Sequence, residues 1–346
     1  MKIKLKTGLL LLLTGLFFNL LCSDKSEVTK PKTSEEGVTK MKWNGWDDCY
    51  QISNATTQVI VVPAIGRIMF YGFKDGPNIL WTDSRLYGQT LPSNLQSVKS
   101  WTNFGGDKVW PTQQDDFGKI NGMSWPPDPW FDGAPHTVKE LEDGVEITGP
   151  VSNYCGAQSI REIRLAEDGS RLLINQRLKK IKKAQIRSVE PIRHTIWNVT
   201  QIKSPLQALF NLNPDSKFSN GYYIFPTGGA ENFSVEGGTG ILVPHVSKSQ
   251  KAGADSDKWL AAIIDNVVFG EFFTFDPAGV YPDNGCSAEV YTSGDYTEIE
   301  LLSPMQYLDI NQEISFNIEW ELYQLPDNAK STAEKRTAAV DWLNSK

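Results

Sequence analysis

Short runs of β-branched and aromatic residues, separated by turn residues, recur throughout residues 43–325 and constrain the fold more than any other feature. Such runs are typical of strands, and this spacing is typical of an all-β domain. They occupy residues 58–62, 144–148, 159–165, 171–178, 195–200, 221–225, 260–264, 267–275, 296–302 and 314–323. Asp168-Gly169 lies between two runs and suits a hairpin turn. Only residues 328–344 resemble a helix, so we predict an all-β domain with a short C-terminal helix.

The first 22 residues resemble the signal peptide of a bacterial lipoprotein. Three lysines precede the uncharged stretch 8–21, which is too short to span a bilayer comfortably. Cys22 follows this stretch directly, where a lipoprotein would be cleaved and its new terminal cysteine acylated. The alternative is an ordinary secretory peptide, with Cys22 lost or left free. We expect an exported, lipid-anchored protein of the bacterial envelope, in the periplasm or on the outer-membrane surface.

The rest of the chain divides by composition. Residues 23–41 are rich in Lys, Glu, Ser and Thr and cannot form a core, so we predict a disordered tether. Residues 42–326 form the β domain, and residues 327–346 form the C-terminal helix. The net charge of −7 and the pI of about 5.2 argue against nucleic acid as a partner.

Aromatic residues are concentrated in segment 101–132, which contains seven of them among glycines, prolines and short polar residues. No run in this segment is long or periodic enough to predict a helix. Flat aromatic faces beside polar side chains suit a sugar ring, which needs both stacking surfaces and placed hydrogen-bonding groups. An aromatic loop that only caps the core has the same composition, because buried tryptophans are mostly packing residues.

Several other chemistries have no support in the sequence. The cysteines at 49, 155 and 286 match no zinc or redox motif; one pair could form a disulfide, or all three could be single buried thiols. The chain contains no phosphate-binding glycine loop before a helix and no Gly-x-Ser-x-Gly elbow. We therefore expect no metal and no cofactor.

Alternation in residues 296–302 assigns carboxylates to one face of a strand. Tyr296, Glu298 and Glu300 share one face, and Ile299 lies on the other, which belongs in the core. We expect the two carboxylates to face solvent or a groove. Charges on the outside of a strand most often form a solvated face.

Several short motifs follow one another in a definite order along the chain. A strand at 59–62 and the Gly-Arg-Ile hairpin at 66–68 are followed by Gly-Pro-Asn at 76–78. Gly-Gly-Asp-Lys-Val-Trp-Pro at 105–111 comes next. Ala-Glu-Val-Tyr-Thr at 288–292 and the strand at 296–302 come far downstream. The order of these motifs resembles that of galactose-mutarotase-like proteins, the aldose 1-epimerase superfamily. The resemblance covers nearly all of residues 43–325 and suggests a bacterial lipoprotein branch of that superfamily.

This resemblance implies a β-supersandwich, in which two large antiparallel sheets pack face to face and a concave face holds a carbohydrate site. In aldose 1-epimerases, a histidine and a glutamate transfer protons at the anomeric hydroxyl and the ring oxygen, so that the ring opens and recloses as the other anomer. Here His194 is the best-placed histidine, and its partner would be Glu298 or Glu300.

The same resemblance, with segment 101–132, suggests which residues line the pocket. The candidates are Asn103, Asp107, Lys108, Trp110, Gln113, Trp125 and Trp130. Gly105 and Gly106 would let the chain aim both Asp107 and Lys108 at a ligand. Lys108 could instead form a surface ion pair with Asp107 or Asp116.

Three functions remain open from the sequence. The leading hypothesis is an envelope protein that binds a mono- or oligosaccharide or processes it by epimerase-like acid–base chemistry. A carboxylate pair for glycoside hydrolysis could come from Asp107, Glu289, Glu298 and Glu300. The rivals are a non-catalytic glycan-binding lipoprotein and a structural envelope domain without a ligand.

Overall fold

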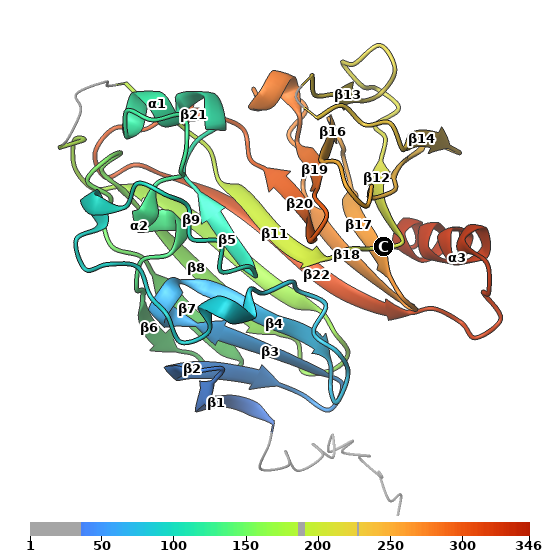
Figure 1. Ribbon diagram of the computed structural model, residues 1–346, viewed down its shortest axis with the longest axis horizontal. Helices are drawn as coiled ribbons and strands as arrows, with labels where there is room; N and C mark the ends of the chain where they lie inside the picture. Colours follow the sequence, from blue (N-terminus) through green and yellow to red (C-terminus); the bar gives the residue numbers. More distant parts are fainter. Residues whose placement is uncertain (1–35, 186–190, 227) are drawn as a thin grey trace, which may run out of the picture. The chain divides into compact units, whose positions relative to one another are not determined.

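The computed structural model describes residues 36–185, 191–226 and 228–346. Two ten-stranded sheets, called sheet I and sheet II below, make up most of this part of the chain (Figure 1). All strand pairings in both sheets are antiparallel. The predicted β-supersandwich is confirmed.

The strands of sheet I are, in spatial order, β1 (Gly37–Trp43), β2 (Trp46–Ser53), β3 (Thr57–Val62), β4 (Arg67–Phe73), β5 (Asp107–Trp110), β11 (Trp197–Lys203), β20 (Tyr296–Leu302), β19 (Ala288–Thr292), β16 (Gln250–Ala254) and β13 (Tyr223–Ile224). Sheet II contains β14 (Phe233–Glu236), β15 (Thr239–Leu242), β12 (Gln207–Asn211), β17 (Trp259–Ile264), β18 (Val267–Phe273), β22 (Glu313–Gln324), β9 (Leu172–Lys180), β8 (Ala157–Leu165), β7 (Gly144–Thr148) and β6 (Thr137–Glu140). A separate two-stranded ribbon pairs β10 (Arg193–His194) with β21 (Gln306–Tyr307).

The main core lies between the two sheets. Tyr71 of sheet I contacts the rings of Phe269 and Trp320 of sheet II, with centroids 5.8 and 5.4 Å apart. Strand β22 shows why: every second residue from Ile314 to Leu322 is buried, while the residues between them are more exposed. A strand with this two-residue period packs one face on the core. The turn at Asp168-Gly169 joins β8 to β9 as predicted, with Gly169 at a φ of 74°.

The C-terminal helix α3 (Thr332–Asn344) begins later than the predicted 327. Ser331 caps it, and Glu334 completes a capping box with Ser331, which fixes the start of the helix. Ala339 and Leu343 pack on Trp259 and its neighbours, on the face of sheet II that is turned away from sheet I. The helix therefore covers a second, smaller core.

The predicted tether is wrong at its end, because residues 37–41 belong to β1. Strand β1 pairs with β2 at the edge of sheet I, where Val38 packs against the main core and Met41 packs against a separate cluster on the other face. The predicted signal peptide, with Cys22, and the rest of the tether to residue 35 lie outside the described residues. Within the described part, no helix is long and apolar enough to cross a membrane.

Segment 101–132 contains more regular structure than the sequence predicts. It holds β5, the 3₁₀ turn η4 (Gln114–Asp116) and the four-residue helices α1 (Phe117–Ile120) and α2 (Pro129–Asp132). Helix α2 begins where Asp128 accepts a hydrogen bond from the backbone of Trp130 and where Pro129 occupies the first turn. A single helical turn is too short to leave a periodic pattern in the sequence.

The three cysteines at 49, 155 and 286 are buried and free, so the disulfide alternative is excluded for them. The remaining short elements are the 3₁₀ turns η1 (Pro63–Ile65), η2 (Ser84–Leu86), η3 (Leu95–Ser97) and η5 (Asp283–Gly285).

Candidate functional site

Five charged side chains lie together on the outer face of sheet I, the face turned away from sheet II. In an antiparallel sheet, residues directly opposite each other point to the same side. The register places one row of side chains across four neighbouring strands: Lys108, Val199, Glu300 and Glu289. A second row lies next to it on the same face: Gln201, Glu298, Tyr291 and Lys251. We call Lys108, Lys251, Glu289, Glu298 and Glu300 the charged row.

Lys108 forms one end of the charged row. Its Nζ lies 3.4 Å from Oε1 of Glu298, which also accepts a hydrogen bond of 3.0 Å from Nε2 of Gln201. The ammonium lies 5.7 Å from the ring centre of Trp101 and 5.4 Å from that of Trp110. Burial lowers the pKa of Lys108 to about 8, although Glu298 opposes the shift. Burial also raises the pKa of Glu298, so burial moves the pKa values of these two groups toward each other.

Lys251 forms the other end. Its Nζ lies 2.6 Å from Glu289 and 3.3 Å from Glu300, and Nε1 of Trp197 donates a hydrogen bond of 2.9 Å to Glu300. Burial disfavours the charge of Lys251, but the carboxylates Glu289 and Glu300 outweigh it and raise its pKa. This lysine therefore stays charged. Burial also raises the pKa of Glu289 well above its usual range.

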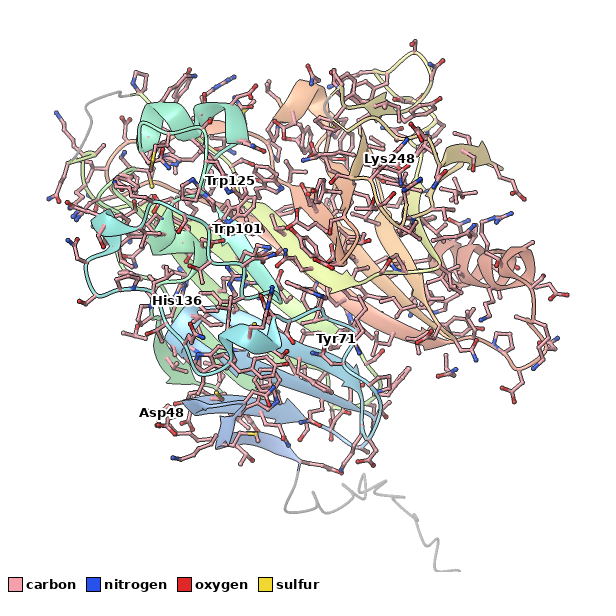
Figure 2. The ribbon with its side chains drawn as sticks, viewed as in Figure 1. Asp48, Tyr71, Trp101, Trp125, His136 and Lys248 are labelled. Atoms are coloured by element: carbon pink, nitrogen blue, oxygen red, sulfur yellow. The ribbon has the colours of Figure 1, made fainter. Side chains whose placement is uncertain are left out.

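The charged row reaches solvent at two of its members. The side chain of Glu298 is 10% exposed and that of Lys251 is 16% exposed, while Lys108 is fully buried. Aromatic side chains surround these openings: Trp81, Trp101, Phe225, Tyr291 and Tyr296 are half-buried and Trp125 is exposed. We call these six residues the aromatic rim; Figure 2 labels Trp101 and Trp125. Hydrogen-bonding groups below stacking surfaces form a site suited to a polar ring compound.

The prediction that Asp107 and Lys108 point at one ligand is wrong. They are neighbours on β5, so their side chains point to opposite faces of sheet I. Asp107 faces sheet II, where it forms a buried ion pair with Arg161 of β8. Its Oδ2 also accepts from Nδ2 of Asn198 at 2.9 Å. The other expected alternative is wrong too, because Lys108 pairs with Glu298 and with neither Asp107 nor Asp116.

Asp107, Arg161 and Glu271 form a buried inner group between the two sheets, in which Thr200 links Asp107 to Glu271. Oγ1 of Thr200 lies 3.2 Å from Asp107 and 2.7 Å from Glu271, but a hydroxyl has only one hydrogen to donate. Burial raises the pKa of Glu271 well above its usual range. Burial therefore favours the protonated form of Glu271, and in that form Glu271 can donate to Thr200 while Thr200 donates to Asp107.

The other predicted pocket residues divide into two groups. Trp110 and Trp125 lie beside Lys108 and its neighbours, where the ring centres of Trp101 and Trp125 are 5.0 Å apart and those of Trp110 and Trp125 are 5.9 Å apart. Trp110 is itself buried, and its Nε1 donates to Asp132 at 2.9 Å.

The second group makes local contacts. Asn103 accepts a hydrogen bond from the backbone of Gly105, and Gln113 donates to Asp116. Trp130 packs in the main core, with its ring 4.9 Å from that of Tyr154. Trp130 therefore matches the alternative interpretation, in which the aromatic residues of this segment only pack on the core.

The structure does not bring His194 to either glutamate. His194 lies in β10, which pairs with β21, and its buried Nδ1 lies 3.3 Å from the carbonyl oxygen of Pro111. Glu300 lies opposite Val199 in sheet I, whereas His194 belongs to the separate ribbon of β10 and β21. Glu298 and Glu300 are also not a solvated face, because both are buried by contacts with other strands.

Sequence reasoning missed Lys251, Gln201 and Arg161. Lys251 is one lysine in a run of small and polar residues, which leaves no signal of burial. No three His, Cys, Asp or Glu side chains of the described residues are close enough to hold a metal ion.

Comparison with known proteins supports the fold. The chain has a TM-score of 0.53 to a candidate mutarotase from Salmonella typhimurium, at 10% identity over 83% of this chain and 94% of that one. A candidate aldose 1-epimerase from Klebsiella pneumoniae gives 0.53, at 10% identity over 88% and 85%. A galactose-mutarotase-like protein from Clostridium acetobutylicum gives 0.50, at 11% identity over 83% and 98%. No family model and no curated protein matches the sequence. At such low identity the likeness shows the fold, which is that of galactose-mutarotase-like proteins.

Proposed function

We propose that this protein binds a carbohydrate on the outer face of sheet I and transfers protons on it through Glu298 and Lys108. The observation that supports this most is the charged row beneath the aromatic rim. A sugar ring can stack on the rim while its hydroxyl groups reach Glu298 and Lys251, the two members exposed to solvent. The shared fold supports this function only by analogy, because proteins with this fold have many different functions.

The chemistry suited to this pair is exchange of the two anomers of an aldose. Both the anomeric hydroxyl oxygen and the ring oxygen are bonded to C1, so a donor and an acceptor 3.4 Å apart can address both. Glu298 takes the hydroxyl proton while Lys108 protonates the ring oxygen, and the C1–O bond of the ring breaks. After rotation about C1–C2, the same transfers in reverse close the ring. Here Lys108 replaces the expected His194.

A binding protein without chemistry is the second candidate. The observation in its favour is that Lys108 is fully buried beneath Trp101 and Trp110, so that a ligand reaches it only after the rings move. The same rim and the same two exposed charges would then hold the glycan.

Substitution of Glu298 separates the two functions. Glu298→Gln keeps the shape but cannot accept a proton, so anomer exchange should fall roughly 100-fold to 10,000-fold while sugar binding changes little. The control is Glu319→Gln, which removes a half-exposed carboxylate of sheet II. Exchange would be followed by NMR, and binding by calorimetry. Binding without exchange in the unmodified protein would indicate the second candidate. If no sugar binds, the proposed function fails.

The proposal includes a lipid anchor in the bacterial envelope. It rests on the sequence pattern around Cys22. Metabolic labelling with a palmitate analogue should mark the full-length chain and should not mark Cys22→Ser. Unchanged labelling of the variant would contradict the anchor.

A further inference from the structure

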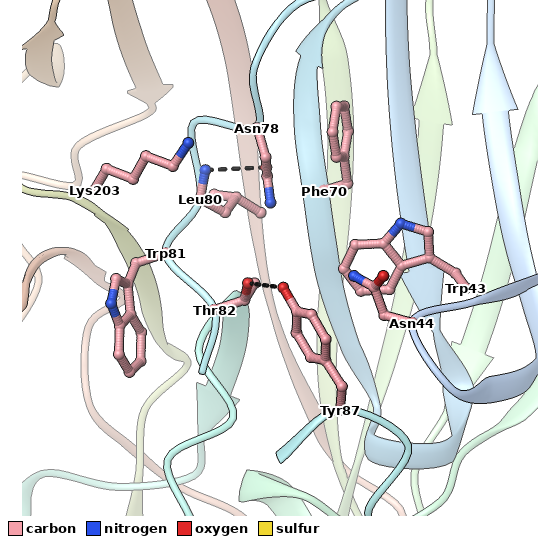
Figure 3. Close-up of a pocket in the computed structure, with 9 residues that line it drawn as sticks. All are labelled: Trp43, Asn44, Phe70, Asn78, Leu80, Trp81, Thr82, Tyr87 and Lys203. Carbon is pink, nitrogen blue, oxygen red and sulfur yellow. Dashed lines mark hydrogen bonds between the residues drawn. The ribbon is translucent and has the colours of Figure 1, made fainter. Parts of the chain in front are cut away.

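A cavity lies on the outer face of sheet I, beside the charged row. It has a volume of about 340 Å³. Figure 3 shows Trp43 and Tyr87 on one side of it and Trp81 and Lys203 on the other, with Thr82 between them. These residues come from the β1–β2 hairpin, the segment after β4 and the end of β11.

The walls of the cavity are aromatic and partly exposed. The ring of Trp43 is half-buried, stacks on Trp46 at 6.1 Å and lies 5.8 Å from the ring of Tyr87. Trp81, on the opposite side, is half-buried as well. Polar groups accompany the rings: the hydroxyls of Thr82 and Tyr87 are 2.8 Å apart, and the exposed Lys203 adds an ammonium. Stacking faces with a few polar groups fit a sugar unit.

Trp81 joins this cavity to the charged row. Its backbone N–H donates to the carbonyl of Gln201 at 2.9 Å, and the bridge between Leu80 and Ile202 places it opposite Gln201. Its ring lies 4.7 Å from that of Tyr296. Gln201 in turn binds Glu298. Lys203 follows Gln201 by two residues on the same face of β11, about 7 Å away, a distance on the scale of one sugar ring.

From this continuity we infer that the ligand is an oligosaccharide of at least two units, whose reacting unit lies over Glu298 and whose neighbouring unit occupies the cavity between Trp43 and Trp81. This inference rests on the proposed function. It predicts that the cavity contributes affinity for a disaccharide and none for a monosaccharide.

The test compares D-glucose and D-galactose with maltose, cellobiose and lactose, by calorimetry on the full chain. At least one disaccharide should bind about tenfold more tightly than its component sugars. Trp43→Leu should weaken that disaccharide roughly threefold to tenfold and leave the monosaccharide unchanged, because only the cavity loses a ring. The matched control is Trp342→Leu, which removes a half-buried ring from α3.

A second variant tests whether any effect of Trp43→Leu comes from damage to the β1–β2 hairpin and not from loss of a contact with the sugar. Lys203→Met keeps the aliphatic stem of an exposed side chain, and should weaken the disaccharide a few-fold with no change in melting temperature. Equal affinity for mono- and disaccharides, or an unchanged ratio in both variants, would overturn the inference while the proposed function stands. If no sugar of the panel binds, both fail together.

Discussion

Asp107→Asn tests the assignment of neighbouring residues to opposite faces of sheet I. The substitution keeps the size of the side chain and removes its charge, so Arg161 loses its buried counter-charge. Both side chains of this pair are at most 2% exposed. Leaving one partner of a buried ion pair alone costs about 3–5 kcal/mol, which is a large share of the roughly 5–15 kcal/mol that stabilises a domain.

Glu271 determines how much of this cost is observed. Burial favours its protonated form in the native protein, and in Asp107→Asn it could release that proton and become the new partner of Arg161 through Thr200. The single variant should then lose less at pH 8 than at pH 5. Measured relative to Glu271→Gln, the double variant Asp107→Asn/Glu271→Gln should lose the full amount at both pH values, because neither side chain can ionise.

Urea denaturation at the two pH values measures these losses. Glu319→Gln is the control, since its pair with Arg171 is 37% and 50% exposed and should contribute about 0–1 kcal/mol. A loss below about 1 kcal/mol in the double variant would refute the buried pair. Loss of sugar binding in Asp107→Asn with unchanged stability would show instead that Asp107 faces the ligand.

Three further predictions follow from burial. Glu271→Gln should stabilise the protein above about pH 4.5, and more at pH 8 than at pH 5. The reason is that a raised pKa of Glu271 stabilises the native state only at low pH. A loss of stability at pH 8 in urea denaturation would contradict this. Trp130→Ala should lower the free energy of unfolding by about 3–5 kcal/mol, whereas Trp125→Ala should lower it by about 1 kcal/mol or less and weaken sugar binding. Similar losses of stability in both variants would contradict the assignment of Trp130 to the core. In a chain without residues 1–22, Ellman's reagent should find no reactive thiol until denaturant is added, because burial raises the pKa of every cysteine: Cys49, Cys155 and Cys286.

The sequence predicted the fold better than the site. Alternation located β7 and β20 with the same bounds as the structure, because each has one apolar face on the core. It also placed Glu298 and Glu300 together. It did not show that they are buried, because the residues that cover and pair with them come from distant strands: Lys108 from β5 and Lys251 from β16. The spacing of charges within one strand carries no information about such partners.

Burial of charge alone does not identify a site in this protein, since sheet I carries buried charges on both faces. Replacing a buried ion pair by apolar residues is often neutral or stabilising, so each group needs a reason beyond stability. The inner group of Asp107, Arg161 and Glu271 lies between the sheets, and all three residues are buried, so no ligand reaches it without separating the sheets.

The outer charged row differs in two respects. Two of its members are partly exposed, and half-buried rings rather than a second sheet surround them. Rings at a loop can move for a ligand at far lower cost than two packed sheets can part. The charged row is therefore the group to test for ligands, and the inner group is the one to test for stability.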